Sequence, residues 1–278
     1  KGGSRRGQKS AGAGEGLPGP AKIIYQTVAP AIHKIAIGER ADTTFVFTTS
    51  ELGLTELTES VRWTAEDLKV EQVWTDDWGV VDEFWIKLFE TLDVGPLYAA
   101  LRADNPYDLY WIDVTQGLMC GPDGSVGYDD SKTWIEFSSV RIQFSVASPY
   151  QQDGNEFKVN TSIGATVNAA GVKAKAIVAQ YASASDYQKL RGYRKEICDL
   201  VNYNTEAINE SNSGTISSSD PWMVIWVFDA DPNTNVVCEG YSKAFQHLCD
   251  LSTFKTGIRC ITVTGNAGNA DEAHMWNV

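Results

Sequence analysis

The sequence lacks several features that define whole classes of protein. No apolar run is long enough to cross a bilayer, so we expect no membrane span, and no stretch has the pattern of a secretory signal peptide. Basic residues are outnumbered, with 23 Lys and Arg against 36 Asp and Glu, which gives a formal charge of −13. This charge argues against nucleic acid or an anionic membrane surface as a partner.

Cysteine is present in a number and spacing that exclude common metal sites. The five cysteines, at positions 120, 198, 238, 249 and 260, form no C-x-x-C pair, so we expect no zinc site, and no bound cofactor is expected either. The odd number fits one free thiol with up to two disulfides, or five reduced thiols. Cys249 and Cys260 fall on the apolar sides of an expected helix and strand, and we interpret both as structural thiols.

The composition is that of a globular protein with one large or two ordinary domains. The chain has 278 residues, of which 43% are hydrophobic and 11% aromatic. Residues 1–20 are rich in Gly, Ser and Arg and are expected to form a flexible tail or linker. We expect an N-terminal mixed α/β domain over residues 21–165 and a second domain over residues 166–278.

Hydrophobic periodicity predicts the main elements. In the first domain it predicts a helix at 21–37, bent or broken near Pro30, then a strand at 43–49 and helical structure at 77–102 interrupted at Gly95 and Pro96. A strand is expected at 109–113, a turn at 121–124, and a long strand or a hairpin at 134–147. Helices are expected to dominate from residue 167, including one that begins near an N-cap region at 183–186. Residues 204–220 are expected to form a mobile loop, and residues 221–228 are ambiguous between strand and helix.

A cysteine at the start of an amphipathic helix is the first candidate functional residue. After Cys238, apolar residues at 241, 244, 245, 248 and 251 recur at helical spacing. The first backbone N–H groups of a helix favour a thiolate, which is the nucleophilic form of cysteine. The preceding Asp231-Pro232-Asn233 region predicts a turn; the acidic pattern from Asp229 imitates a calcium loop, but it lacks the required glycine and glutamate. A buried structural thiol is the alternative for Cys238.

A histidine near the end of the chain is the second candidate. The sequence has only three histidines, His33, His247 and His274, and only His274 falls on a predicted strand. That strand follows another one at 259–265, which closes on Gly265, and a short loop.

The order of these motifs resembles the transglutaminase-like superfamily of papain-type cysteine enzymes, including its secreted bacterial members. The resemblance rests on V-C-E-G-Y-S-K-A-F at 237–245, L-C-D at 248–250, G-I at 257–258, T-V-T-G at 262–265 and H-M-W-N at 274–277. More loosely, it includes 109–113 and the helix that begins D-Y-x-K-L at 186. It implies an α+β fold, with an N-terminal mixed region followed by a papain-like core in which the nucleophile helix packs on an antiparallel sheet. It also implies that Cys238 and His274 are the catalytic pair.

Two features depart from the family pattern. The connection at 252–256 is longer than usual, which a loop tolerates at little cost. The family's catalytic carboxylate lies on the strand after the histidine, and no residue of this sequence, which ends at Val278, is assignable to that role. The C-terminal strands of the core are therefore expected to be missing from residues 166–278.

Three functions follow from the resemblance. The first is a thiol hydrolase that cleaves peptide or amide bonds through a thioester acyl-enzyme, with a protein or peptide substrate and an extracellular or cell-surface location. The second is a catalytically silent cell-surface binding or scaffold module. The third is a protein cross-linking transglutaminase, in which a lysine amine replaces water as the acceptor. The sequence does not determine the oligomeric state.

Overall fold

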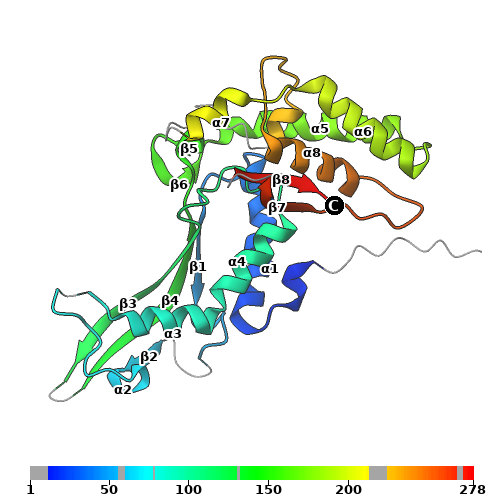
Figure 1. Ribbon diagram of the computed structural model, residues 1–278. Coiled ribbons are helices and arrows are strands. Elements are labelled where there is room, and N and C mark those ends of the chain that lie inside the picture. The colour runs from blue at the N-terminus through cyan, green and yellow to red at the C-terminus, as the bar shows by residue number, and fades with distance from the viewer. Residues whose placement is uncertain (1–11, 56–59, 78, 130–131, 213–223, 268–271) are drawn as a thin grey trace, which may run out of the picture.

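The computed structural model describes residues 12–55, 60–77, 79–129, 132–212, 224–267 and 272–278. The protein is mixed α/β, and its paired strands are antiparallel. Figure 1 shows an elongated molecule in which a long strand pair extends away from a group of helices that contains α5, α6 and α8. Of the helices in the described ranges, none combines the length and apolarity that crossing a bilayer requires.

The main sheet is built around strand β4 (Thr133–Phe144). Strand β3 (Leu118–Tyr128) pairs along one of its edges, and β1 (Thr44–Thr48) and β2 (Val61–Thr64) share the other. The buried residues of β4 are all apolar and lie on one face of the strand, with a shift after Phe137, where the pairing with β3 has an irregularity. Two smaller hairpins are formed by β5 (Gln151–Gln152) with β6 (Asn155–Val159) and by β7 (Thr262–Ala267) with β8 (Glu272–Asn277).

The N-terminal helices pack against this sheet and one another. They are α1 (Gly19–Ala36), the short α2 (Ala65–Leu68), α3 (Asp82–Leu92) and α4 (Val94–Asp104). Helix α1 continues through Pro30 instead of breaking there. Pro30 is exposed, so the carbonyl that loses its helical partner faces water and the buried face of the helix stays intact.

The C-terminal helices surround α8 (Cys238–Asp250). Helices α5 (Gly164–Gln180) and α6 (Asp186–Leu200), the 3₁₀ turn η4 (Val224–Val227) and strand β8 all contact α8, whereas α7 (Thr205–Asn212) lies farther out (Figure 1). The predicted N-cap of α6 is confirmed: the Ser185 hydroxyl accepts a hydrogen bond from Gln188 N, and the Gln188 side chain accepts one from Ser185 N.

Four expectations about local structure are corrected. The tail predicted over residues 1–20 is not a tail from residue 12 onward, because η1 (Ala13–Gly16) docks on Asp104, whose carboxylate accepts hydrogen bonds from Ala13 N and Gly14 N at 2.9 Å each. Residues 1–11 lie outside the described ranges. The helical segment predicted at 77–102 is interrupted, as expected, but at Asp93, which is in a left-handed conformation, and not at Gly95 and Pro96. Pro96 lies in the first turn of α4, where its missing N–H costs nothing.

The other two corrections concern strands. The turn predicted at 121–124 lies inside β3, where an irregular pairing to β4 accommodates Pro122 and Gly124. The strand predicted at 109–113 is mainly a buried turn with one bridge, Ile112 to Val146. Four consecutive apolar side chains there are all buried, whereas a strand with one exposed face would alternate. Two 3₁₀ turns, η2 (Ser148–Tyr150) and η3 (Thr161–Ile163), flank β5 and β6.

Residues 204–228 differ from both predictions made for them. Helix α7 occupies part of the predicted mobile loop, and η4 occupies part of the apolar segment that was ambiguous between strand and helix; residues 213–223 lie outside the described ranges.

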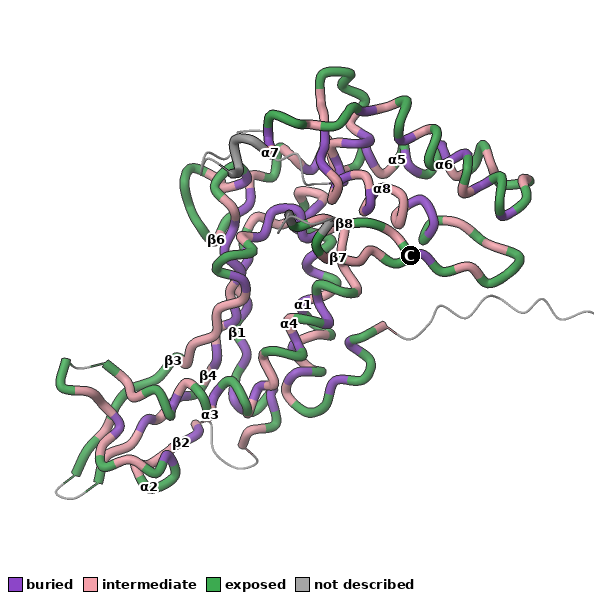
Figure 2. The backbone as a smooth tube through the Cα atoms, in the orientation of Figure 1, coloured by how far each residue is buried: buried purple, intermediate pink, exposed green. Residues whose placement is uncertain are grey.

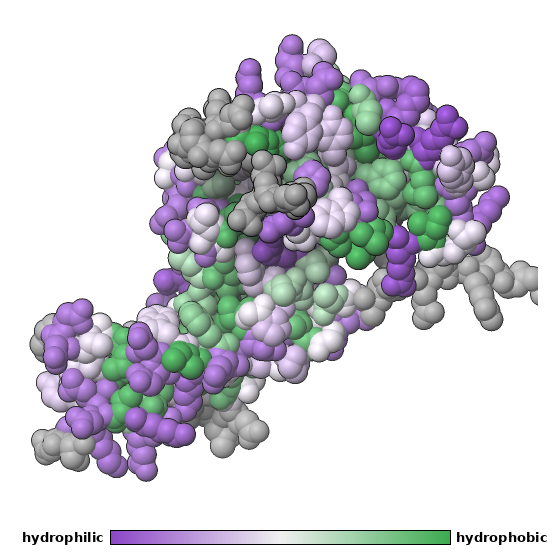
Figure 3. Space-filling model, in the orientation of Figure 1, coloured by the Kyte–Doolittle hydropathy of each residue, from purple (hydrophilic) through white to green (hydrophobic). Residues whose placement is uncertain are grey.

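Buried residues from both halves of the chain belong to one hydrophobic cluster, which runs from Leu17 to Cys260. Figure 2 shows buried positions along α1, β1, β4 and α8. Figure 3 shows that some hydrophobic side chains reach the surface over the middle of the molecule. The division of the chain at residues 165 and 166 stays a prediction.

Candidate functional site

The two residues selected from the sequence, Cys238 and His274, line the same cleft. Its volume is about 360 Å³, and it is bounded by the last two turns of α6, the first half of α8, strand β8 and Tyr203. Although 35 residues separate them in the sequence, a helix and a strand each present one of the two candidate side chains to a shared space. The arrangement suits a thiol and an imidazole that act together.

Cys238 is the first residue of α8, as the sequence predicts. The residue before it, Val237, is extended and provides no side-chain cap, so the N–H groups of the first helical turn have no side-chain acceptor. The approach to the helix is fixed by Val236, which is fully buried and exchanges backbone hydrogen bonds with Asn202 O and Asn204 N. Cys238 itself is half-buried, so its sulfur lies at a defined helix end without being enclosed in the core.

His274 lies on β8, opposite Gly265 of β7. Its ring stacks on Trp276, two residues along the same face of the strand, with centroids 6.2 Å apart and an angle of 21° between the planes. A Cβ atom at Gly265 would come within 2.7 Å of the Trp276 ring. Glycine at this position therefore leaves the space in which the Trp276 ring lies beside His274.

Polar contacts hold the β7–β8 hairpin against α8. The Ser242 hydroxyl donates to Met275 O at 3.0 Å, and the Asn277 amide donates to Ser242 O at 2.9 Å. Nearer the other end of α8, the Thr262 hydroxyl donates to Gln246 at 2.6 Å. Strand β8 and helix α8 consequently run in the same direction, and His274 lies in the half of the strand that is nearer to Cys238.

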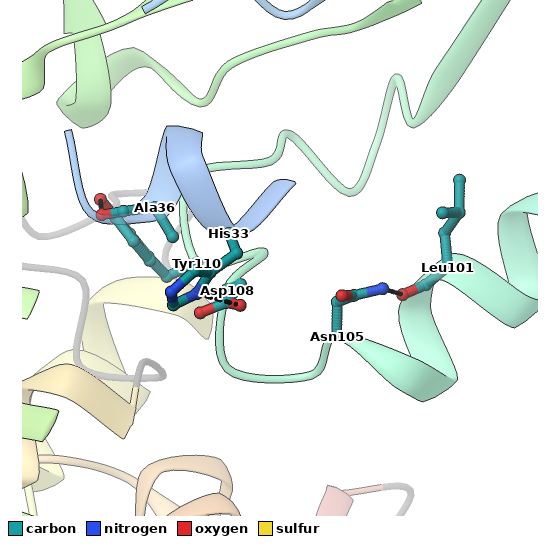
Figure 4. A network of polar contacts seen from close by, with 6 residues as sticks. All are labelled: His33, Ala36, Leu101, Asn105, Asp108 and Tyr110. Carbon is teal, nitrogen blue, oxygen red and sulfur yellow. Dashed lines mark hydrogen bonds and ion pairs between the residues drawn. The ribbon is translucent and has the colours of Figure 1, made fainter. Parts of the chain in front are cut away.

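The other two histidines lie elsewhere. His247 is nine residues after Cys238 in the same helix, about 13.5 Å farther along its axis. Its ring lies 4.2 Å from that of Tyr107, and burial, with a smaller effect of the Lys175 charge, lowers the pKa of His247 to about 4. His33 pairs with Asp108 at 3.0 Å, and Figure 4 shows the two side chains turned toward each other. Neither residue lines the cleft.

None of the described residues that line the cleft is an Asp or Glu that could orient the His274 ring. Asn277 is the only amide there, and its Nδ2 already donates to Ser242 O and Thr262 Oγ1. The structure thus leaves the role of third catalytic group unassigned within the described ranges, as the sequence did.

The remaining cysteines fall into two groups. Cys249 and Cys260 are buried and in contact: a hydrogen bond between the thiols, together with burial, raises the pKa of Cys249. Burial raises the pKa of Cys120 to about 12. Cys198, by contrast, is exposed and lines the cleft with Cys238.

Sequence reasoning missed the wall of the cleft opposite β8. Arg194, Ile197 and Cys198 form this wall from one face of α6, and Tyr203 follows the helix. Their spacing of three and four residues marks a common helical face. The sequence contains no signal that turns this face toward Cys238, because that depends on how α6 crosses α8.

The loop at 252–256, longer than the resemblance predicts, is tied to the first turns of α6. Asp186 accepts hydrogen bonds from Lys255 N and Thr256 N, and Lys189 donates to Thr253 O at 2.6 Å. These hydrogen bonds hold the longer loop against the first turns of α6.

The acidic residues before Cys238 form hydrogen bonds within their own turn. Asp229 accepts from Asp231 N and from the Thr234 hydroxyl, and Asp231 accepts from Asn233 N. Within the described ranges, no group of three His, Cys, Asp or Glu side chains is arranged to hold a metal ion.

The chain was compared with known protein families and with curated proteins. Neither a scan against models of protein families nor a search of curated proteins finds a match to the chain.

Proposed function

We propose that the protein is a transglutaminase-like thiol enzyme that hydrolyses peptide or amide bonds, with Cys238 as nucleophile and His274 as its acid–base partner. The observation that carries the proposal is the presence of both residues in one cleft. The motifs at 237–245 and 274–277, which resemble this superfamily, give the same pair independently of the geometry. Packing of α8 on the antiparallel β7–β8 hairpin supports a papain-like arrangement of this part of the chain.

The chemistry follows from the positions of the two groups. His274 takes the proton of Cys238, and the thiolate attacks the amide carbonyl, so that an S–C bond forms. The uncapped N–H groups at the start of α8 can stabilise the oxyanion. The C–N bond then breaks, and His274 returns its proton to the leaving amine. Water attacks the resulting thioester and releases the acid, which regenerates the thiol.

A lysine amine that resolved the same thioester would make the protein a cross-linking enzyme. The half-exposed position of Cys238 admits either acceptor. We propose hydrolysis as the principal reaction, a protein or peptide as its substrate, and an extracellular or cell-surface location for the enzyme.

One observation favours a second candidate, a catalytically silent binding module. No described cleft residue is acidic, so the group that would orient His274 is unassigned, while exposed aromatic side chains surround the cleft. A surface of this kind can bind a peptide without reacting with it.

Alkylation by iodoacetamide near pH 6 tests the proposal. A thiolate paired with an imidazolium stays reactive at this pH, whereas an ordinary thiol is almost entirely protonated. We expect Cys238 to be labelled faster than Cys198, an exposed thiol of the same cleft, and we expect His274→Ala to remove the difference. His33→Ala is the matched control, since His33 lies outside the cleft.

Equal labelling of Cys238 and Cys198 in the unaltered protein would overturn the enzyme proposal and favour the binding module. If Cys238 is activated, incubation with a glutamine peptide and a primary amine separates the two reactions. Release of ammonia without incorporation of the amine indicates hydrolysis, and incorporation indicates cross-linking.

A further inference from the structure

An arginine with no partner among the described residues lies in the same cleft. Arg194 is exposed on α6, lines the cleft with Cys238 and His274, and makes no hydrogen bond or ion pair within the described part of the chain. The acidic side chains near it on α6 are already engaged: Glu196 accepts from the Tyr181 hydroxyl, and Asp199 pairs with Lys195. The guanidinium charge is therefore uncompensated by its own helix.

The sign of this charge is opposite to that of the protein as a whole. The chain carries a formal charge of −13, yet no described residue that lines the cleft is acidic. An acidic ligand would be repelled by most of the surface, so its binding requires a local cation, and Arg194 is the only Lys or Arg among the described residues of the cleft. Arginine also suits this task because its planar guanidinium can donate two parallel hydrogen bonds to one carboxylate.

Aromatic rings form much of the remaining cleft surface. Tyr203 and Trp276, which both line the cleft, are 47% and 40% exposed. Tyr203 stacks on Tyr241, whose hydroxyl donates to Val201 O, and Phe245 continues the apolar surface along α8. Exposed aromatic groups gathered around a reactive thiol provide a surface for apolar side chains of a peptide.

We infer that Arg194 binds a substrate carboxylate, and that the cleft takes peptides with an acidic side chain beside an apolar or aromatic one near the reacting amide. This inference rests on the proposed function, because it assigns the substrate class of the same site. Arg194 is a specificity-determining residue in this arrangement and takes no part in proton transfer.

The competing reagents iodoacetate and iodoacetamide test the inference without a known substrate. Both alkylate a thiolate with loss of iodide, but only iodoacetate carries a carboxylate. The measured quantity is the rate of alkylation of Cys238 by iodoacetate divided by its rate of alkylation by iodoacetamide. We expect Arg194→Gln to lower the ratio about fivefold, the upper range for one solvent-exposed ion pair, and we expect 1 M NaCl to reduce the difference. Arg191→Gln is the matched control: Arg191 is exposed on the same helix and does not line the cleft.

An unchanged ratio in Arg194→Gln overturns the inference, as does an equal fall in Arg191→Gln, which would reflect only the overall charge. A second measurement addresses the peptide directly. An acetylated Phe-Glu-Ala amide should protect Cys238 from iodoacetamide at lower concentration than the corresponding Phe-Ala-Ala peptide, and this preference should disappear in Arg194→Gln. Equal protection by the two peptides in the unaltered protein refutes the assigned substrate class.

The two proposals fail in different ways. If His274→Ala leaves the iodoacetamide rate at Cys238 unchanged, the catalytic pair is wrong, but the ratio still reports whether Arg194 binds a carboxylate. If His274→Ala slows the alkylation of Cys238 but Arg194→Gln leaves the ratio unchanged, the proposed catalytic pair is supported and the assigned substrate class is wrong.

Discussion

Protonation of His247 should destabilise the protein at mildly acidic pH. Burial lowers the pKa of His247 in the folded protein to about 4, whereas a histidine in the unfolded chain has a pKa near 6.5. Between these values the unfolded state binds a proton that the folded state excludes. The free energy of unfolding therefore falls as the pH decreases from about 6.5 to about 4, and it rises with pH in this window.

The magnitude follows from the pKa difference. About 2.5 pKa units correspond to roughly 3.4 kcal/mol over the whole window, of which about 2 kcal/mol is lost between pH 7 and pH 5. The environment explains why the proton is excluded: the ring packs between Tyr107 and Phe228, its Nδ1 has no hydrogen-bond partner, and Lys175 adds positive charge nearby.

Urea denaturation followed by tryptophan fluorescence at pH 7, 6 and 5 measures the effect. In His247→Phe, which keeps an aromatic ring of similar size against Tyr107, the free energy of unfolding should vary much less with pH. His33→Gln is the control, because His33 is exposed and pairs with Asp108. Both His33 and His247 line a second cavity, separate from the cleft that contains Cys238. If His247→Phe retains the pH dependence of the unaltered protein, or if His33→Gln removes it, the assignment to His247 is refuted.

Three further predictions concern the elements that position the cleft. Ser242→Ala removes one hydrogen bond to β8. It should lower the free energy of unfolding measured by urea denaturation by about 1 kcal/mol and slow the alkylation of Cys238. Gly265→Ala places a methyl group against Trp276 and should shift the tryptophan emission, whereas a change confined to stability would contradict the close approach. Lys189→Met removes the hydrogen bond to Thr253 O in the loop after α8 and should speed proteolysis of that loop. Lys195→Met, on the exposed side of α6, should not have this effect.

Elements with a regular hydrophobic period were predictable from the sequence. Helix α8 begins at the predicted residue because a turn precedes Cys238 and the apolar spacing after it is regular. Strand β4 was predicted for the same reason: its alternation is long enough to exclude a helix. The failures involve residues whose local preference is overridden by pairing. Pro122 and Gly124 favour a turn, but one long partner strand holds both in β3.

The candidate site was predictable only in part. The order of a cysteine before a helix and a histidine on a strand selected Cys238 and His274, since each signal is local in the sequence. Arg194 and Tyr203 carry no such signal: an exposed arginine and a tyrosine after a helix are common features, and they gain their role only from the crossing of α6 over α8. Sequence periodicity fixes which residues share a helical face, but it does not fix which neighbour that face meets.

The placement of His274 in the same cleft as Cys238 depends on polar contacts more than on burial. Among the residues of β7 and β8 whose side chains the structure describes, none is buried, so the hairpin gains little from the hydrophobic effect. Its position on α8 is set instead by Ser242, Thr262 and Asn277, whose hydrogen bonds each contribute about 1 kcal/mol. Small losses of stability at these residues should therefore produce large losses of thiol reactivity, because opening the hairpin separates the imidazole from the sulfur while the core that anchors α8 remains folded.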